Sequence, residues 1–199
     1  MSFKRTYKRQ QNSLTFFPRR FGTYFSLILI FLFGFGCGYS FLTIEPPSLS
    51  SISRDASQIT VCFSPGEQCE TQIIAALRSA QSEILIQAYA LTSKPIASAL
   101  MDAQERGVSI KILYDAKQAS QKHSQISFLT QHGIETKVDA VSGLAHNKVM
   151  IIDEKVLLTG SYNFSHAANY RNSENLLIIN DASLAKLYKD NWLKRFNSY

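Results

Sequence analysis

Six polar side chains of types that can cleave phosphate esters lie close together in the last third of the sequence. They are His146, Lys148, Asp153, Ser161, Asn163 and Glu174. His146 and Lys148 are two residues apart at the start of the apolar segment "KVMII", so on a strand both side chains would project from one face. Ser161 and Asn163 repeat this spacing in "GSYNFS". The spacing therefore predicts catalytic groups held on rigid strands.

Cleavage of a phosphodiester needs a nucleophile, groups that hold the non-bridging oxygens, and an acid for the leaving oxygen. His146 can be the nucleophile if a carboxylate fixes its second nitrogen, and Glu174 is the candidate for that role. Lys148, Ser161 and Asn163 would hold the phosphate with an ammonium, a hydroxyl and an amide. The sequence lacks a carboxylate cluster of the kind that Mg²⁺ or Ca²⁺ favours. We therefore expect a covalent reaction that needs neither metal nor cofactor, with the leaving-group acid still to be found.

These segments resemble the motifs of the phospholipase D superfamily. "HNKVMIID" matches its HxKxxxxD signature, "GSYNFS" matches its GSxNF element, and "RNSEN" is similar to its downstream acidic element. The resemblance extends from about Val61 to Trp192 and is to the small bacterial Nuc-type endonucleases, which carry a single motif. The mitochondrial cardiolipin hydrolase/Zucchini branch has a similar plan. The resemblance implies a phosphohistidine at His146, and it implies that Asp153 supports the structure of the site.

The same resemblance implies that the active site needs a second subunit. Longer members of the superfamily carry a second histidine motif, which protonates the leaving alcohol and then activates water, whereas this sequence has one motif. We therefore expect His146 of a second copy to supply the acid across the axis of a homodimer. The expected substrate is DNA or RNA, cleaved without sequence preference. Hydrolysis of a phospholipid such as cardiolipin, or an idle nucleic-acid-binding dimer, are the alternatives.

Each polar residue also has an ordinary structural interpretation. A strand can have polar ends, Ser161 and Asn163 are common turn residues, and Glu174 could be a surface carboxylate. The three motifs in register favour a site. His123, His132 and His166 are interpreted as surface or capping residues. Tyr89 and Asp115 end strands near where a cleft could open, and core packing is the preferred interpretation of the tyrosine. Lys117, Lys122 and Arg171 are interpreted as solvated charges, with contact to a polyanion as the alternative.

Apolar runs alternate with helical patterns from Gln58 onward. Seven segments have the apolar pattern of strands: 58–63, 83–91, 108–115, 134–139, 147–153, 155–160 and 174–180. Four segments favour helices: one capped by Ser64 with Pro65 at its first position, one from a Ser93 cap to Gly107, 120–132 closed by Gly133, and 182–196. The βαβα order followed by a hairpin at 153–155 predicts an α/β sandwich with a mixed central sheet flanked by helices, as in phospholipase D-like proteins.

Cys62 and Cys69 are the only cysteines after residue 44. Two thiols cannot make a four-cysteine zinc site. Cys62 is expected near the end of a strand and Cys69 in the first turn of the next helix, which leaves them within reach of each other. In an oxidising compartment they could form a local disulfide, and two unpaired core thiols are the alternative.

The net charge of +6 comes from the N-terminal tail. Six of the 21 Lys and Arg residues precede the first acidic residue, Glu45, which leaves 15 basic residues against 15 acidic ones. From Glu45 onward the chain is formally neutral, so the basic balance is not a sign of a nucleic-acid-binding surface.

Residues 21–44 contain no charged side chain and, as a helix, would be roughly 36 Å long, enough to cross a bilayer. The positive charges before them predict a cytoplasmic N-terminus. We expect a single-pass protein of the bacterial inner membrane with its catalytic domain in the periplasm. A cleaved signal peptide, giving a secreted or periplasmic protein, is the alternative. The expected parts are a basic tail (1–20), an anchor or signal segment (21–44), a flexible linker (45–57) and the catalytic domain (58–199).

Overall fold

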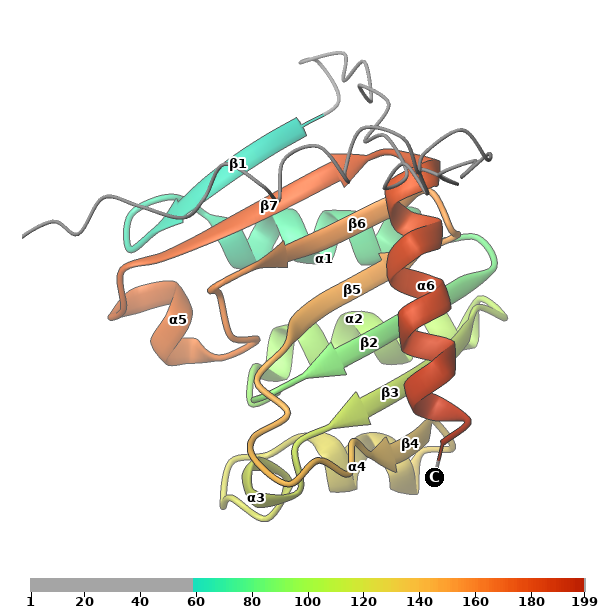
Figure 1. Cartoon of the computed structure of the whole chain (residues 1–199). Coiled ribbons are helices and arrows are strands. Elements are labelled where there is room, and N and C mark those ends of the chain that lie inside the picture. The colour runs from blue at the N-terminus through green and yellow to red at the C-terminus, as the bar shows by residue number, and fades with distance from the viewer. Residues whose placement is uncertain (1–58, 199) are drawn as a thin grey trace, which may run out of the picture. The chain divides into compact units, whose positions relative to one another are not determined.

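Seven strands form one mixed sheet in the computed structural model of the protein, which describes residues 59–198 (Figure 1). The strands are β1 (Ile59–Ser64), β2 (Glu83–Ala88), β3 (Ser109–Tyr114), β4 (Glu135–Val138), β5 (Lys148–Ile152), β6 (Val156–Gly160) and β7 (Glu174–Asn180). Their order across the sheet is β1-β7-β6-β5-β2-β3-β4. β2, β3 and β4 are parallel to one another, and every other neighbouring pair is antiparallel.

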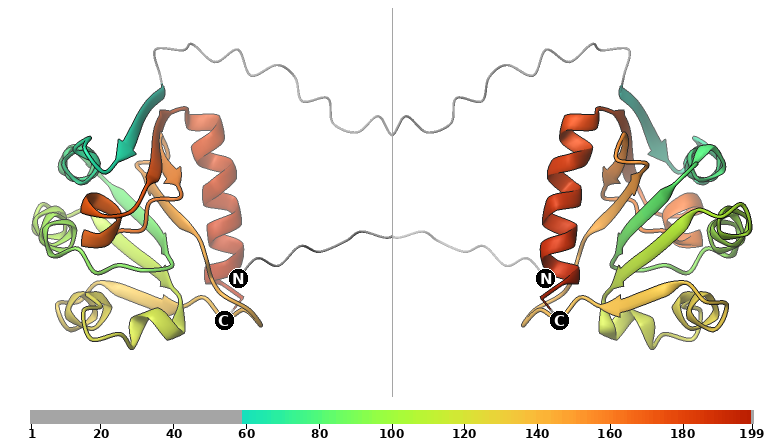
Figure 2. Two further views of the ribbon diagram at one scale, coloured as in Figure 1. Left: turned by 90° about the vertical axis from the view of Figure 1, so that its left-hand side faces the viewer. Right: turned by 90° about the vertical axis from the view of Figure 1, so that its right-hand side faces the viewer.

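Helices cover both faces of this sheet (Figure 2). They are α1 (Cys69–Ser79), α2 (Lys94–Glu105), α3 (Ala116–Ala119), α4 (Ile126–Gln131), α5 (His166–Tyr170) and α6 (Ala182–Phe196). α1, α2 and α4 lie on one face and α6 on the other. Ile73 and Leu100 belong to the hydrophobic core on the α1–α2 face, and Trp192 packs with Leu85 on the α6 face. The predicted α/β sandwich with a mixed, helix-flanked sheet is confirmed for these residues.

The two central strands, β5 and β2, explain where the polar side chains gather. Each is buried along almost its whole length, because helices cover both faces. They pair so that Ala88, the last residue of β2, is opposite Lys148, the first residue of β5. The ends of β2, β3 and β6 and the starts of β5 and β7 therefore lie at one end of the sheet, at the left in Figure 1, which we call the site end.

The predicted helix start at Ser64 is wrong. Ser64 continues β1, where it pairs with Glu174, and its hydroxyl donates to the Ala168 carbonyl oxygen at 2.6 Å. Pro65 lies in a turn, and the helix begins at Cys69. Strand pairing and the contact with α5 therefore hold Ser64, so its hydroxyl does not cap the helix.

The predicted helix over 120–132 is also only partly correct. The chain forms the short helix α3, then an irregular stretch, and α4 covers only Ile126–Gln131. Ser120 donates its hydroxyl to the Lys117 carbonyl, and the Ser124 hydroxyl accepts from the Ile126 amide. Such side-chain bonds to the backbone compete with helical hydrogen bonds, which is why the helix breaks here.

Local signals were more reliable at two other places. Ser93 caps α2 by accepting from the Ile96 amide, and the turn after β5 has positive φ at Asp153 (51°) and Glu154 (54°), as the predicted hairpin requires. Cys62 and Cys69 are joined by a disulfide, with 5.7 Å between their Cα atoms. This is the pairing that the sequence allowed, and it ties the start of α1 to β1.

The predicted tail, anchor and linker at 1–20, 21–44 and 45–57 lie outside the described residues, and they stay predictions. Within 59–198, none of the helices has the length and apolar composition needed to cross a bilayer.

Candidate active site

The site end of the sheet brings together most of the predicted site residues. His146 precedes β5, Lys148 begins it, Ser161 follows β6, and Glu174 begins β7. These strands are consecutive neighbours, so segments that are 13 or more residues apart in sequence meet here. Tyr89, directly after β2, also lies here, although core packing is the interpretation that the sequence favours for its position at a strand end.

His146 is exposed at the mouth of β5, and the backbone on both sides of it is fixed. The Tyr89 amide donates to the Asn147 carbonyl at 2.7 Å, and the Ala145 amide donates to Asp115 Oδ2 at 3.0 Å. The imidazole packs on the Tyr89 ring, with 4.4 Å between ring centroids. Backbone anchoring and one aromatic contact thus hold the ring while leaving it open to solvent.

The His146 side chain makes no hydrogen bond to any residue in the range 59–198, and it therefore lacks the expected contact with Glu174. A histidine nucleophile needs one ring nitrogen free for attack, which this arrangement supplies. Within the described residues, the other ring nitrogen is likewise without a hydrogen-bond partner.

Lys148 is a buried cation, only 6% exposed. Its Nζ donates to the His146 carbonyl at 2.9 Å and lies 4.7 Å from the centre of the Tyr89 ring, a cation–π contact. Burial lowers the pKa of Lys148, and the negative charge of Glu174 partly opposes this. A desolvated ammonium beside the nucleophile is well placed to bind an anionic phosphate, which would restore its favourable electrostatic surroundings.

Glu174 is held by two donors at the start of β7. Ser161 Oγ donates to Glu174 Oε2 at 2.6 Å, and Asn172 Nδ2 donates to Glu174 Oε1 at 3.0 Å. Ser161 Oγ also accepts from the Asn175 amide at 3.1 Å. A hydroxyl has a single proton to donate, so Ser161 here positions Glu174 and has no donor left for a phosphate oxygen.

Asn163, in contrast to Ser161, has a polar side-chain atom without a hydrogen-bond partner in the described residues. This atom, Oδ1, is buried. An unpaired buried acceptor is unfavourable, so a donor that enters the site would be favoured there.

Asp153 lies at the opposite end of β5 from His146, and the five residues of that strand alone span roughly 16 Å. Its carboxylate accepts from the Gln81, Ser82 and Glu83 amides and from the Ser82 hydroxyl, at 2.8–3.0 Å. Burial raises the pKa of Asp153, but these bonds outweigh it and lower the pKa overall. Asp153 therefore fixes the β5–β6 turn against the start of β2 and is not near the other five residues.

Gly160 allows β6 and β7 to lie unusually close together at the site end. Its backbone lies so near Asn175 in β7 that a Cβ at this position would overlap the Asn175 carbonyl oxygen. The Ser161 and Tyr162 amides both donate to that same oxygen, at 3.1 and 3.2 Å. The glycine in "GSYNFS" thus allows the close approach that brings Ser161 to Glu174.

Metal-binding side chains are not grouped in this region. Over residues 59–198 there is no set of three or more His, Cys, Asp or Glu side chains positioned to hold a metal ion. Metal independence itself stays a prediction that chelation can test.

Sequence and structure comparisons agree with this geometry. A family described as "Cardiolipin synthase, PLD-like domain" matches residues 73–195. A protein named phospholipase D from Rickettsia bellii is 44% identical over 152 residues, 76% of this chain and 75% of the relative. The mitochondrial cardiolipin hydrolase of Canis lupus familiaris is 32% identical over 62% of this chain and 48% of its own length. The crystal structure of Nuc, a phospholipase D family member from Salmonella typhimurium, superposes with a TM-score of 0.66 and 34% identity, covering 70% of this chain and 93% of Nuc.

His146 and Lys148 lie at the start of a central strand of a mixed sheet, within the residues that the family model matches. The chain belongs to the phospholipase D superfamily. It is therefore a hydrolase of phosphodiester bonds, similar in sequence and structure to the Nuc-type branch.

The sequence analysis assigns no site role to three residues that build the site: Tyr89, Asp115 and Asn172. Tyr89 and Asp115 each follow a strand directly, which was a usable signal, but the β2–β5 pairing that brings Tyr89 to His146 is not visible in sequence. Asn172 lies inside "RNSEN" and was overlooked beside its acidic neighbour.

Proposed function

We propose that the protein is a nuclease that hydrolyses phosphodiester bonds of DNA or RNA without sequence preference. The observation that carries this proposal is the likeness to Nuc, which covers 93% of that chain. The described domain is thus close in extent to Nuc, and the motifs resemble those of the Nuc-type endonucleases. His146 lies exposed at the end of the sheet, where a long polymer can reach it.

The reaction proceeds in two displacements at phosphorus. An imidazole nitrogen of His146 forms a bond to phosphorus, and the leaving ester oxygen departs with a proton from His146 of a second subunit. Water then attacks phosphorus, gives its proton to that second imidazole, and releases His146. Lys148 holds a non-bridging oxygen through both steps, and Tyr89 keeps the nucleophile in place.

We infer a homodimer because the mechanism needs two histidines and the described part of one chain supplies one to the site. In residues 59–198 the site holds a single histidine, and His123, His132 and His166 lie on other segments. A two-fold axis at the site end would bring two copies of His146 together, because an isologous interface juxtaposes equal surfaces.

The proposed location is the periplasmic side of a bacterial inner membrane, with residues 21–44 as the anchor. The Cys62–Cys69 disulfide supports an oxidising compartment. A cleaved signal segment would leave the same domain in the same compartment.

Phospholipid hydrolysis is the second candidate, and the name of the Rickettsia relative favours it. An anchored domain would have lipid phosphodiesters within reach. The nuclease interpretation is preferred because the described domain adds no long loops to the Nuc-like fold that would cover a lipid tail.

One comparison tests the proposal. The full-length protein in detergent is incubated with single-stranded DNA, duplex DNA, RNA and cardiolipin vesicles, each with EDTA, beside His146→Ala. We expect cleavage of nucleic acid that EDTA does not affect and that the variant loses. Turnover of cardiolipin alone would overturn the nuclease proposal, loss of activity with EDTA would overturn the metal-free mechanism, and no turnover of any substrate would favour an idle binder.

A further inference from the structure

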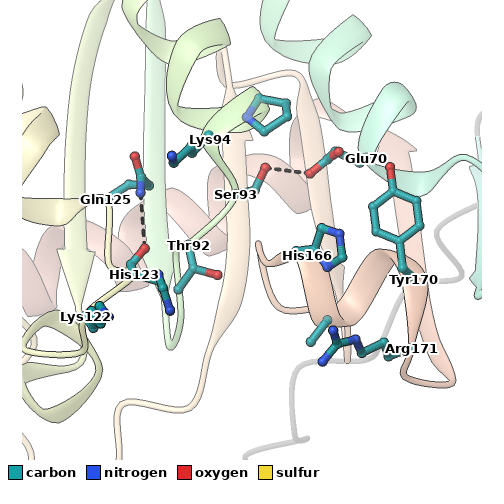
Figure 3. A pocket seen from close by; sticks show the side chains of 12 residues that line it. Glu70, Thr92, Ser93, Lys94, Lys122, His123, Gln125, His166, Tyr170 and Arg171 are labelled. Atoms are coloured by element: carbon teal, nitrogen blue, oxygen red, sulfur yellow. Dashed lines mark hydrogen bonds between the residues drawn. The ribbon is translucent and has the colours of Figure 1, made fainter.

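A pocket of about 750 Å³ opens beside the catalytic residues and contains none of them. Its walls come from the start of α1, the segment after β2, the start of α2, the stretch before α4, and α5 with the residue that follows it. Figure 3 shows Lys94 and Lys122 on one side of it and Tyr170 and Arg171 on the other, with the His166 ring between.

The pocket shares a wall with the catalytic site. The Thr92 and Ser93 amides donate to the Phe164 carbonyl at 2.9 and 3.0 Å, and Phe164 belongs to "GSYNFS". His166 is three residues after Asn163, so their Cα atoms are at most about 11 Å apart. α5 and the residues on either side of it connect Asn163 to Glu174, so the pocket borders a segment that begins and ends at the catalytic site.

Among the described residues, the pocket cations have no carboxylate partner, a property that they share with exposed Arg78 and Lys155, whereas three other lysines are paired. Lys111, Lys186 and Lys189 each have a carboxylate partner at 2.6–3.1 Å. Lys122 and Arg171 form no ion pair with any residue that the structure describes, and neither does Lys94.

One carboxylate, Glu70, also lines the pocket. Its Oε1 accepts from the Ser93 hydroxyl at 2.5 Å, so it is tied to the start of α2. In Figure 3 Glu70 and Arg171 lie on one side of the pocket and Lys122 lies on the other, so each side carries a cation. A nucleic-acid strand that crosses the pocket would therefore meet a cation on each side, Lys122 and Arg171, at successive phosphates.

The rim of the pocket carries an exposed aromatic pair. Tyr170 is 58% exposed, and its ring packs against the His166 ring with 4.5 Å between the ring centroids. A solvent-exposed aromatic face next to cations is the combination that single-stranded nucleic-acid sites use, since bases stack on the ring while cations hold the backbone.

We propose that this pocket binds a nucleotide that flanks the scissile bond, with the phosphates on its two sides at Lys122 and Arg171 and its base on Tyr170. This rests on the proposed nuclease function and adds a preference for single strands, because only an unpaired base can turn onto a side chain. A lipid headgroup would satisfy the cations but would leave the exposed ring without a partner.

The test measures binding and cleavage separately. Equilibrium binding of a fluorescent single-stranded 12-mer to the full-length protein is followed in the inactive His146→Ala background at several salt concentrations. Lys122→Ala/Arg171→Ala is compared with Arg78→Ala/Lys155→Ala, which removes the same charge at the opposite end of the sheet. Tyr170→Ala is compared with Tyr170→Phe, which keeps the ring. Hydrolysis of a small diester, bis(4-nitrophenyl) phosphate, reports the catalytic groups without a flanking nucleotide.

We expect the double pocket variant to lower the slope of log affinity against log salt by about 1.4 in magnitude, the value for two lost contacts to a single strand. Tyr170→Ala is expected to weaken binding about tenfold, with Tyr170→Phe close to the parent protein. With His146 restored, the ratio of kcat/KM for the 12-mer to that for the small diester should fall by a similar factor.

Several results would overturn the proposed role of the pocket without contradicting the proposed nuclease activity. They are an unchanged salt slope, equal losses in the Arg78/Lys155 control, and equal effects of Tyr170→Ala and Tyr170→Phe. Binding to cardiolipin vesicles is measured for the same variants. If the double pocket variant loses this binding and still binds the 12-mer, the pocket is assigned to a lipid. If the parent protein cleaves the small diester but no nucleic acid, the nuclease proposal itself fails.

Discussion

The ammonium of Lys148 is buried, which is unfavourable for a charge. Its pKa therefore depends on the charges of neighbouring residues and of bound substrate. Burial against Tyr89 lowers the pKa of the ammonium, and the carboxylate of Glu174 is the nearby group that raises it. Glu174 therefore has an electrostatic role in addition to any contact with a histidine. A phosphate oxygen that binds Lys148 would supply a second negative charge and favour the ammonium further.

This coupling predicts how the pH profile changes in Glu174→Gln. Lys148 binds phosphate only while protonated, so kcat/KM falls as the pH rises through its pKa. Removal of the Glu174 charge lowers that pKa further, so the alkaline fall in kcat/KM is expected at lower pH than in the parent protein. Profiles of kcat/KM for a small diester check this, with Glu105→Gln on the exposed side of α2 as the control. An alkaline limb that does not move would contradict the role given to Glu174.

Asp153 illustrates a motif residue whose work is structural. Asp153→Asn is expected to lower the free energy of unfolding by about 1–2 kcal/mol and to leave kcat per folded molecule nearly unchanged. Because its pKa is lower in the folded state than in the unfolded chain, its stabilisation is present above the unfolded pKa and is lost as the pH falls through the folded one. Urea unfolding at neutral and acidic pH measures both effects. A variant that loses turnover while keeping its stability would show that Asp153 acts in catalysis.

At the scale of elements, the approach of β6 to β7 decides whether the site forms. Gly160→Ala places a methyl group against the Asn175 carbonyl, so β6 and β7 have to separate at the site end. We expect a loss of more than about 1 kcal/mol in the free energy of unfolding, together with a fall in kcat because Ser161 moves away from Glu174. Chemical denaturation and steady-state kinetics measure these, and Gly143→Ala, where a Cβ meets open space, is the matched control. Parent-like stability of Gly160→Ala would mean that the close approach is not needed.

Elements were predictable from sequence where local patterns decide them. The continuous apolar runs of β2 and β5, the Ser93 cap and the turn at 153–155 are all local signals, and each appears in the structure. Prediction failed where a long-range contact decides the structure, as for Ser64, which pairs with Glu174 across the sheet. The site residues divide in the same way between local and long-range signals. The motif residues were predicted from the sequence, whereas the contact of Tyr89 with His146 depends on strand pairing and was not predicted.

At the scale of the whole molecule, one chain supplies one nucleophilic histidine, and the proposed mechanism uses two. Subunit mixing tests this directly. If each working site needs His146 from both copies, a one-to-one mixture of parent and His146→Ala subunits, exchanged to equilibrium, should retain about one quarter of the parental activity per total protein. Independent subunits would retain about one half. Analytical ultracentrifugation confirms the assembly state in each mixture, and full activity in a strictly monomeric protein would contradict the shared site.

The central claim is that His146 bonds to phosphorus during turnover. The most direct measurement is peptide mass spectrometry of the full-length protein, quenched in alkali during cleavage of a nucleic-acid substrate, since a phosphorus–imidazole bond survives in base. The account predicts an adduct that carries the phosphoryl end of the substrate on the peptide containing His146, and none in His146→Ala. Turnover without an adduct on that residue, or an adduct on a different one, would contradict it.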